Sequence, residues 1–324
     1  MFPGLKPVMT AIALIAFVMP ATRGIANEYS SVIEQEHRVE RGSRIAVRNE
    51  FGDIRIDGSD RNTLEAVATD LNSSQPVPVS ITEASSANKK VFTVNPTLES
   101  GRGDRQKINI LLEVKVPHDV ELAPIYLRRG NISINNLDGG VNLRTDDGNI
   151  SVQRVGSSGG GFVEATAGSG NVDLSNINGD VRILAISSGI TVRCVKGDVA
   201  ARVSSGYIAV SNIDGDVELN VSSGSASFTG PIHAECRYRL KTLSGNISMD
   251  IPDTVGFTAV LSAYSGQLEN DFQFSNDSQT PPSRTNRRVV GKYGDGSGRI
   301  ELDSFSGRVR LRKIAASGGT DCQR

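Results

Sequence analysis

A repeat of about 18 residues constrains this chain more than any other feature of its sequence. The repeated unit begins at a turn residue and then alternates apolar and polar positions. Its starting positions are Gly130, Gly148, Gly170, Ser188, Gly206, Gly224 and Gly245. We place the fourth start at Ser188, because only then do Ile190 and Val192 fall in register with Ile132 and Ile134. A single register therefore relates all seven units.

Each unit contains two short segments in which apolar residues occupy every second position. In the first unit these are Ile132 and Ile134, followed by Val141 and Leu143. A period of two, bounded by Gly, Asn, Asp and Ser, predicts strands with one buried face. Neither strand can bury that face unless the next unit stacks on it. The sequence therefore predicts an all-β fold.

Two β architectures fit this pattern. Asp-Gly or Asn-Gly pairs at 138–139, 178–179 and 214–215 are strong hairpin signals, and they favour an antiparallel β-meander or sandwich. The other architecture is a single-stranded β-solenoid, in which each unit forms one coil. One further column repeats between the two strands, as Asn136, Asn176, Cys194 and Asn212. Stacked asparagines can form a hydrogen-bonded ladder, so this column favours the solenoid.

The N-terminal 26 residues have the features of a secretory signal peptide. Lys6 supplies a positive charge, residues 8–19 are apolar except for Thr10, and small residues follow Pro20. The apolar stretch is short for a transmembrane helix. We therefore expect an exported protein, located in the periplasm, at the cell surface or outside the cell, without a stable membrane span after signal cleavage.

The remaining sequence divides into an N-terminal β cap region, 27–125, and a repeat domain, 126–313. Residues 48–56 already resemble the start of a repeat. A polar stretch with two prolines predicts a loop at 270–290, and residues 314–324 are expected to form a flexible tail. A cap is needed because the open end of a solenoid is an unpaired strand edge.

Composition excludes several classes of function. The chain has 35 Lys and Arg against 36 Asp and Glu, a net charge of -1, which is unlike a nucleic-acid-binding protein. It has three histidines and three cysteines, all far apart in sequence, so no Cys/His zinc motif is present. No catalytic or cofactor-binding motif stands out.

Aspartates follow the second turn glycine in three successive units, at Asp180, Asp198 and Asp216. Stacked coils would bring these carboxylates about 4.8 Å apart, where a bound Ca²⁺ would relieve their repulsion. The simpler interpretation is that each aspartate accepts a hydrogen bond from a turn amide. We favour the turn interpretation and keep a calcium column as a hypothesis.

The cysteines suggest one disulfide hypothesis. Cys194 and Cys236 lie two coils apart, about 9.6 Å along a solenoid axis, which is too far for a bridge. Cys322 lies in the predicted tail, and we expect it to form intermolecular links, which export would permit.

Recurrent Ser-Ser-Gly and Ser-Gly turns, the Gly-Asp-Val triplets between strands and Val114-Lys115-Val116-Pro117 together resemble the bacterial "putative adhesin" family of exported, head-GIN-like β-repeat proteins. The similarity covers about 45–313. It implies a β-solenoid in the cell envelope, and it carries over no catalytic residues.

We therefore expect a non-catalytic protein that binds a surface glycan or an envelope protein, or that self-associates as a scaffold. The alternative is a β-helical enzyme that degrades polysaccharides. Such an enzyme would gather charged residues on one outward face, and the basic candidates are Arg182, Arg202, Arg237, Arg239 and Lys241. We expect these to occupy different columns, which argues against a catalytic site.

Overall fold

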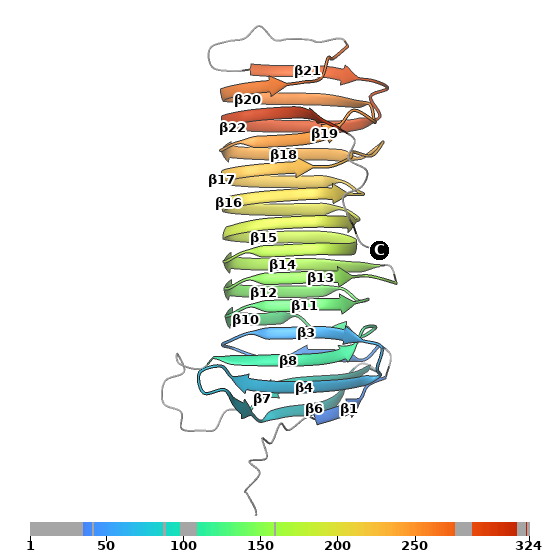
Figure 1. Ribbon diagram of the computed structural model, residues 1–324, viewed down its shortest axis with the longest axis vertical. Coiled ribbons are helices and arrows are strands. Elements are labelled where there is room, and N and C mark those ends of the chain that lie inside the picture. Colours follow the sequence, from blue (N-terminus) through green and yellow to red (C-terminus); the bar gives the residue numbers. More distant parts are fainter. Residues whose placement is uncertain are drawn as a thin grey trace, which may run out of the picture. The chain divides into compact units, whose positions relative to one another are not determined.

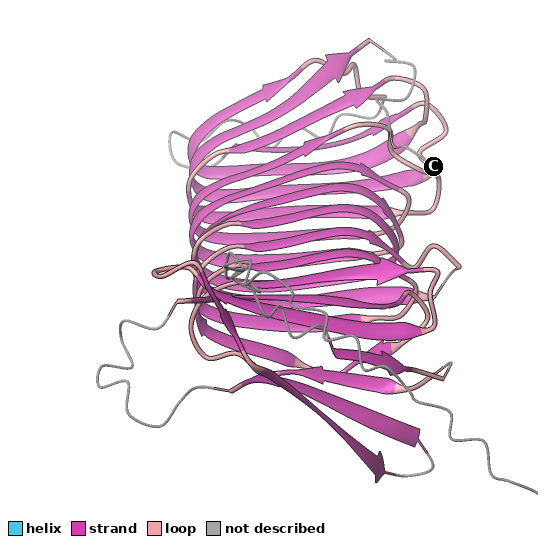
Figure 2. Cartoon of the chain, turned by 60° about the horizontal axis from the view of Figure 1, so that its bottom comes forward, coloured by secondary structure: helices cyan, strands magenta, loops and turns pink. Residues whose placement is uncertain are grey.

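The computed structural model describes most of the chain after the predicted signal peptide, which itself lies outside the described residues. The described residues are 35–40, 42–86, 89–97, 109–158, 160–275, 287–315 and 322. They form strands and no helix (Figure 2), and they all belong to one contact unit, Val32–Arg324. Accordingly, none of them forms a helix with the length and hydrophobicity needed to cross a bilayer.

The repeats form a stack of strands that follows chain order over most of its length (Figure 1). Its members are β10 (Ile125–Arg129), β11 (Ile132–Leu137), β12 (Val141–Asp147), β13 (Ile150–Val155), β14 (Gly161–Ser169), β15 (Val172–Lys196), β16 (Val199–Ile213), β17 (Val217–Thr229), β18 (Arg237–Ser244), β19 (Ile247–Pro252), β20 (Phe257–Asn270), β21 (Arg287–Tyr293) and β22 (Gly298–Ile314).

Successive repeats pair in parallel, each residue lying beside its equivalent in the next coil. β15, β16 and β17 show this most regularly, with Val181 paired to Val199 and Val199 to Val217. Ser188 pairs with Gly206, which confirms the predicted start of the fourth unit. The Asp-Gly and Asn-Gly pairs join the two halves of one coil, and the flanking strands pair with neighbouring coils. The hairpin meander is therefore wrong for the array.

Each coil contributes one strand segment to each of two walls, which we call face A and face B. Face A includes residues 181–187, 199–205 and 217–223, and face B includes 190–195, 208–213 and 226–229. The apolar residues at alternate positions point between the walls, so that Ile208, Val210 and Leu219 are buried. The core is therefore a continuous apolar strip between the two faces.

The corner that leads from face A to face B is built from stacked glycines. Gly224 has a φ of 134°, and a Cβ atom added to it would overlap the carbonyl oxygen of Gly206 in the coil below. Both the backbone conformation and the close stacking thus require glycine. This explains why glycine marks the start of nearly every repeat.

The opposite corner explains the predicted asparagine column differently from the prediction. Its residues share a left-handed backbone, with φ between 53° and 60° at Asn136, Arg154, Asn176, Cys194 and Asn212. Asparagine tolerates this conformation better than most residues. The column therefore reflects backbone geometry, and a side-chain ladder is not the reason for it.

A hydrogen-bonded ladder of polar side chains does occur, but in the column that follows the corner glycines. The side chain of Asp53 accepts hydrogen bonds from the main chain and side chain of Asn131. The Asn131 side chain likewise accepts hydrogen bonds from the main chain and side chain of Asn149. The Asn149 side chain accepts one from the main-chain amide of Asn171. Each side chain thereby satisfies an amide of the adjacent coil.

The C-terminal coil departs from chain order. β22 pairs with β18 and β19 on one side and with β20 on the other, so the last coil is inserted between two earlier ones (Figure 1). β21 then pairs antiparallel with β20. Because β20 ends at Asn270 and β21 begins at Arg287, the predicted loop 270–290 is wrong at its first residue and over its last four.

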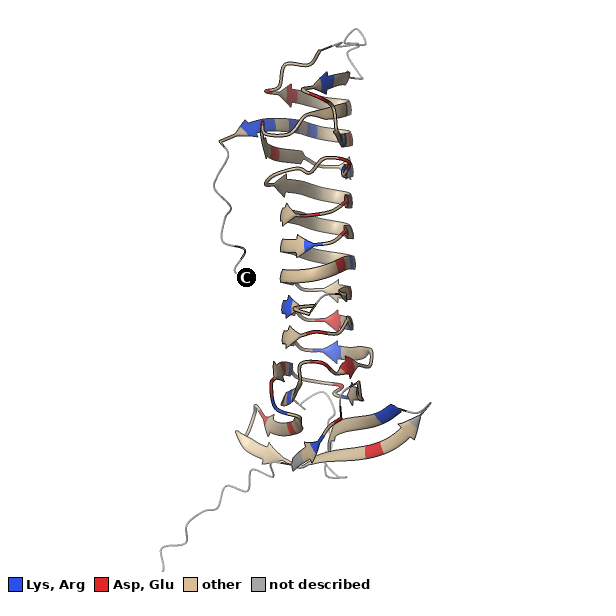
Figure 3. Ribbon diagram, turned by 90° about the vertical axis from the view of Figure 1, so that its right-hand side faces the viewer, with Lys and Arg blue, Asp and Glu red and all other residues tan. Residues whose placement is uncertain are grey.

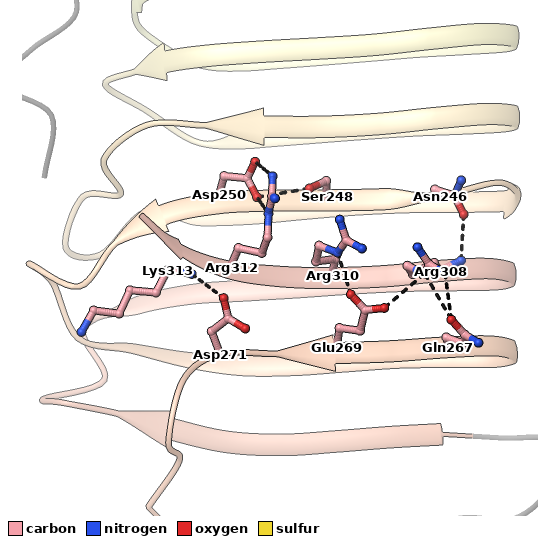
Figure 4. A network of polar contacts seen from close by, with 10 residues as sticks. All are labelled: Asn246, Ser248, Asp250, Gln267, Glu269, Asp271, Arg308, Arg310, Arg312 and Lys313. Carbon is pink, nitrogen blue, oxygen red and sulfur yellow. Dashed lines mark hydrogen bonds and ion pairs between the residues drawn. The ribbon is translucent and has the colours of Figure 1, made fainter. Parts of the chain in front are cut away.

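Charge complementarity specifies where β22 inserts (Figures 3 and 4). Its outward face carries Arg308, Arg310 and Arg312. Arg312 forms two hydrogen bonds of 2.6 and 2.7 Å with Asp250 of β19, and Arg310 bonds Glu269 of β20 at 2.7 Å. A basic strand thus lies between two strands that present carboxylates, which also fixes its register.

The N-terminal region first continues the parallel stack and then ends it with antiparallel strand pairing. Its strands are β1 (Gln35–Arg38), β2 (Arg44–Val47), β3 (Ile54–Ser59), β4 (Thr63–Asp70), β5 (Gln75–Val77), β6 (Val79–Ser86), β7 (Lys89–Pro96), β8 (Ile110–Pro117) and β9 (Glu121–Leu122). β3 pairs in parallel with both β11 and β8, which bears out the repeat-like start at 48–56. β4 then pairs antiparallel with β8, and β6, β7, β2 and β9 form a separate sheet.

Cys194 and Cys322 form a disulfide with a Cα–Cα distance of 5.5 Å. The expectation of an intermolecular link through Cys322 is therefore wrong. Cys236 is a free thiol, as expected from its distance to Cys194. Burial, together with the negative charge of Asp216, raises the pKa of the Cys236 thiol above its ordinary value, which disfavours the reactive thiolate.

Candidate functional site

Face A is hollowed along its upper half. One hollow of about 580 Å³ and a second of about 290 Å³ share Arg202 and Asn220 in their lining, so they form one continuous depression, which we call the trough. The first hollow extends to Tyr264 and Arg288, and the second extends in the other direction to Glu164. The trough therefore crosses many coils, from β14 to β21.

One outward column forms the floor of the trough. In order along the stack its members are Leu184, Arg202, Asn220, Lys241, Asp303, Ser262 and Arg288, each paired with the next. Neighbouring members are about 4.8 Å apart because that is the spacing between paired strands. The inserted strand β22 contributes Asp303 to this column, between Lys241 and Ser262.

An apolar wall stands beside this floor. It consists of Leu243, Phe305 and Tyr264, which precede the Ser-Gly turns of three adjacent coils and are 61%, 52% and 49% exposed. The rings of Tyr264 and Phe305 stack with centroids 4.9 Å apart and an interplanar angle of 9°. Large apolar side chains exposed side by side in this way mark an interaction surface more often than isolated ones do.

Sequence reasoning missed this wall, although a signal was available. The equivalent residues in two preceding coils are Ser204 and Ser222, which come directly before Ser-Gly. An aromatic residue that replaces serine at an outward position is therefore a visible departure from the repeat. That Phe305 lies between Leu243 and Tyr264 could not be read from the sequence, because this order depends on the insertion of β22.

The cations of the trough differ in their partners. Glu301, just outside the floor column, binds Lys241 at 3.2 Å and Arg239 at 2.9 Å. Burial alone would raise the pKa of Glu301, but these hydrogen bonds outweigh burial and lower it, so the carboxylate stays ionised. Within the described residues, Arg202 and Arg288 have no ion-pair partner. Their guanidinium groups remain available to a ligand.

The basic residues considered for an enzyme share columns more than the sequence predicted. Arg202 and Lys241 lie in the floor column with Asn220 between them. Arg182 and Arg239 share a second column, in which two other residues lie between them. Arg237 lies in a third column. The expectation that all five occupy different columns is therefore wrong. The sixth repeat is three residues longer than the usual 18, and this extra length brings Lys241 into the column of Arg202 and Arg239 into the column of Arg182.

Asp180, Asp198 and Asp216 stack in one column on face A, as predicted. The main-chain amide of Asp198 donates to Asp180 at 3.0 Å, and that of Asp216 donates to Asp198 at 2.9 Å. Asp216 in turn accepts from the main-chain amide of Arg237 at 2.8 Å. Each aspartate therefore satisfies a main-chain amide, as the simpler interpretation expected, but the amide belongs to the next coil. Among the described residues, no three His, Cys, Asp or Glu side chains gather as a metal site. Calcium binding at the column stays a prediction.

Substitution of Asp198 separates these two roles. We expect Asp198→Asn to change the free energy of unfolding by less than about 0.5 kcal/mol, because an asparagine oxygen accepts the same amide bond. We expect Asp198→Ala to cost about 1 kcal/mol, because the amide of Asp216 loses its partner. Urea unfolding with and without Ca²⁺ measures both. Equal destabilisation by the two variants, or calcium stabilisation lost in Asp198→Asn, would instead support the calcium column.

The comparison with known families identifies the repeat. The family model described as Toastrack DUF4097 matches residues 42–256, which is more than half of the chain. The chain belongs to the Toastrack DUF4097 family. This assignment agrees with the resemblance drawn from the Ser-Gly turns. Within this Toastrack chain, the matched region includes the coils up to β19 and ends before β20, β21 and β22.

Three solved structures are similar to this Toastrack chain at low identity. A "putative cell adhesion protein" from Clostridium sporogenes is 12% identical, with 87% of this chain and 99% of that chain covered and a TM-score of 0.20. A "putative adhesin" from Bacteroides fragilis is 14% identical, with 87% and 96% covered and a TM-score of 0.27. A "putative lipid binding protein" from Parabacteroides distasonis is 13% identical, with 86% and 96% covered and a TM-score of 0.27. The search of curated proteins gave no match.

Proposed function

We propose that this protein is an exported, non-catalytic binding protein of the cell envelope or cell surface, and that the trough binds a surface glycan in the manner of an adhesin. In this proposal the chain is a single-stranded β-solenoid with an N-terminal β cap, and its rigid stack holds the binding side chains in fixed register. The signal-like N-terminus and the family resemblance support export.

One observation carries the proposal: the stacked, exposed rings of Tyr264 and Phe305 form one wall of the trough beside a floor of hydrogen-bonding side chains. Sugars present apolar CH faces and polar hydroxyl edges to a protein. The wall suits the first, and Asn220, Lys241 and Ser262 on the floor suit the second. Side chains fixed by a sheet bind with little loss of conformational entropy.

Replacement of both rings tests the proposal. We expect wild-type protein to bind a subset of glycans on an array, and Tyr264→Ala with Phe305→Ala to weaken that binding about tenfold or more, because central aromatic contacts supply most binding energy. Tyr207→Ala is the matched control, since Tyr207 is exposed but lies outside the trough. A wild-type protein that binds no glycan, or a control that loses as much as the double variant, would refute the proposal.

Light scattering and product analysis separate the alternatives. A binding protein is expected to stay monomeric as its concentration rises, whereas a scaffold assembles. An enzyme would shorten the bound polysaccharide over time, which chromatography of the sugar after incubation detects.

A further inference from the structure

Arginines on the two faces of the stack differ in how their charge is satisfied. On face B, Arg308, Arg310 and Arg312 each bind a side-chain partner from an adjacent strand (Figure 4). In the trough, Arg202 and Arg288 are exposed and have no ion-pair partner among the described residues. The arginines on face B thus hold adjacent strands together, whereas among the described residues these two arginines on face A have no charged partner.

The first hollow has an excess of positive charge. Its lining contains Arg202, Lys241 and Arg288 against the single carboxylate of Asp303. Lys241 is already bound by Glu301, so the two arginines are the cations that a ligand can pair with. A guanidinium binds carboxylate and sulfate groups through two parallel hydrogen bonds. The chemistry of this hollow therefore favours an anion.

The placement of the two arginines indicates an extended ligand. Both lie in the floor column, where Asn220, Lys241, Asp303 and Ser262 separate them. Five steps of the column place their backbone positions about 24 Å apart. A small anion could reach only one of them, whereas a linear polymer along the stack axis reaches both and passes the apolar wall between them.

We propose that the ligand of the trough is a linear acidic polysaccharide, with its carboxylate or sulfate groups bound by Arg202 and Arg288 and its sugar rings packed against Leu243, Phe305 and Tyr264. This inference rests on the proposed function and adds the charge, shape and direction of the ligand. A periodic row of polar side chains, one per coil, matches a polymer whose own groups recur along its length. A peptide strand would gain no sheet edge here, because the trough lies on a sheet face.

Calorimetric titration with polymers of different charge tests the inference. The probes are polygalacturonate, which carries carboxylates, dextran sulfate, and neutral dextran of matched length. We expect the wild-type protein to bind at least one acidic polymer about tenfold or more tightly than dextran, because hydrogen bonds between ionised groups are stronger than those between neutral groups. Binding should weaken when ionic strength rises from about 0.01 to about 0.15 M, since exposed charges are then screened.

Single substitutions assign the charge to the trough. We expect Arg202→Gln and Arg288→Gln each to weaken binding of the acidic polymer by about tenfold, and the double variant by more. Arg237→Gln is the matched control, because Arg237 is an exposed arginine on the same face outside both hollows. Binding by the control should stay within about twofold of wild type.

The outcomes separate this inference from the proposed function. If neutral dextran or a neutral array glycan binds best, and the Tyr264 and Phe305 variants lose it while the arginine variants do not, the acidic ligand is refuted and glycan binding stands. Equal losses in Arg237→Gln and Arg202→Gln would mean non-specific attraction and would refute the inference. If neither array nor polymers bind, both proposals fail.

Discussion

Gly224→Ala is expected to destabilise the protein by about 4 kcal/mol. A backbone φ of 134° costs a residue with a side chain about 1–3 kcal/mol. The added methyl group would also overlap the carbonyl oxygen of Gly206, and overpacking of this kind costs about 1–3 kcal/mol. The neighbouring carbonyl belongs to the ladder between coils, so it cannot turn away without loss of hydrogen bonds. Urea unfolding measured by circular dichroism gives the difference.

Gly42→Ala separates the two contributions. Gly42 also has a positive φ, 72°, but a Cβ atom there would meet nothing within 4 Å. We expect it to cost only the conformational part, about 1–2 kcal/mol. Equal losses in the two variants would show that the close approach of the coils is unimportant, and would contradict the explanation given for the glycine corner.

Cys322→Ser is expected to lower the free energy of unfolding by about 2–4 kcal/mol. The disulfide joins residues 128 apart in sequence, so its loss releases a long loop in the unfolded chain. It also joins Cys322 to Cys194 in β15, several coils away from β22 in the stack. Urea unfolding of wild type with and without dithiothreitol should show the same loss, and the variant should then be insensitive to the reductant.

Cys236→Ser is the control for this prediction, because Cys236 is a free thiol. It should leave stability within about 0.5 kcal/mol of wild type. Alkylation without reduction should modify one cysteine per chain, and non-reducing electrophoresis should show a monomer. Three reactive thiols, or a disulfide-linked dimer, would contradict the intramolecular bridge.

The regular part of the fold could be predicted because each repeat carries its own register. Gly206 and Gly224 mark the same corner, and the alternation of Ile208 and Val210 specifies which side faces the core. Such local signals need no knowledge of distant segments. The aspartate column followed from the same register, although its hydrogen bonds run to amides of the next coil.

The place of β22, the order of the apolar wall and the bridge to Cys322 escaped prediction because they depend on contacts between distant segments. β22 follows β20 in sequence yet lies between β19 and β20, and its arginines match carboxylates on both neighbours. The order of the apolar wall, with Phe305 between Leu243 and Tyr264, depends on that arrangement. The bridge between Cys194 and Cys322 likewise joins residues 128 apart in sequence. No spacing within the repeats encodes these contacts.

The position of β22 also dictates the order in which the molecule can be assembled. During synthesis, the coils up to β19 can stack one after another. The next strand in the stack is β22, which is made only near the end of synthesis. A chain truncated before residue 298 would lack β22, the strand that lies between β19 and β20. Cys322 follows β22 in the chain, so its bridge to Cys194 can form only after every strand has been synthesised.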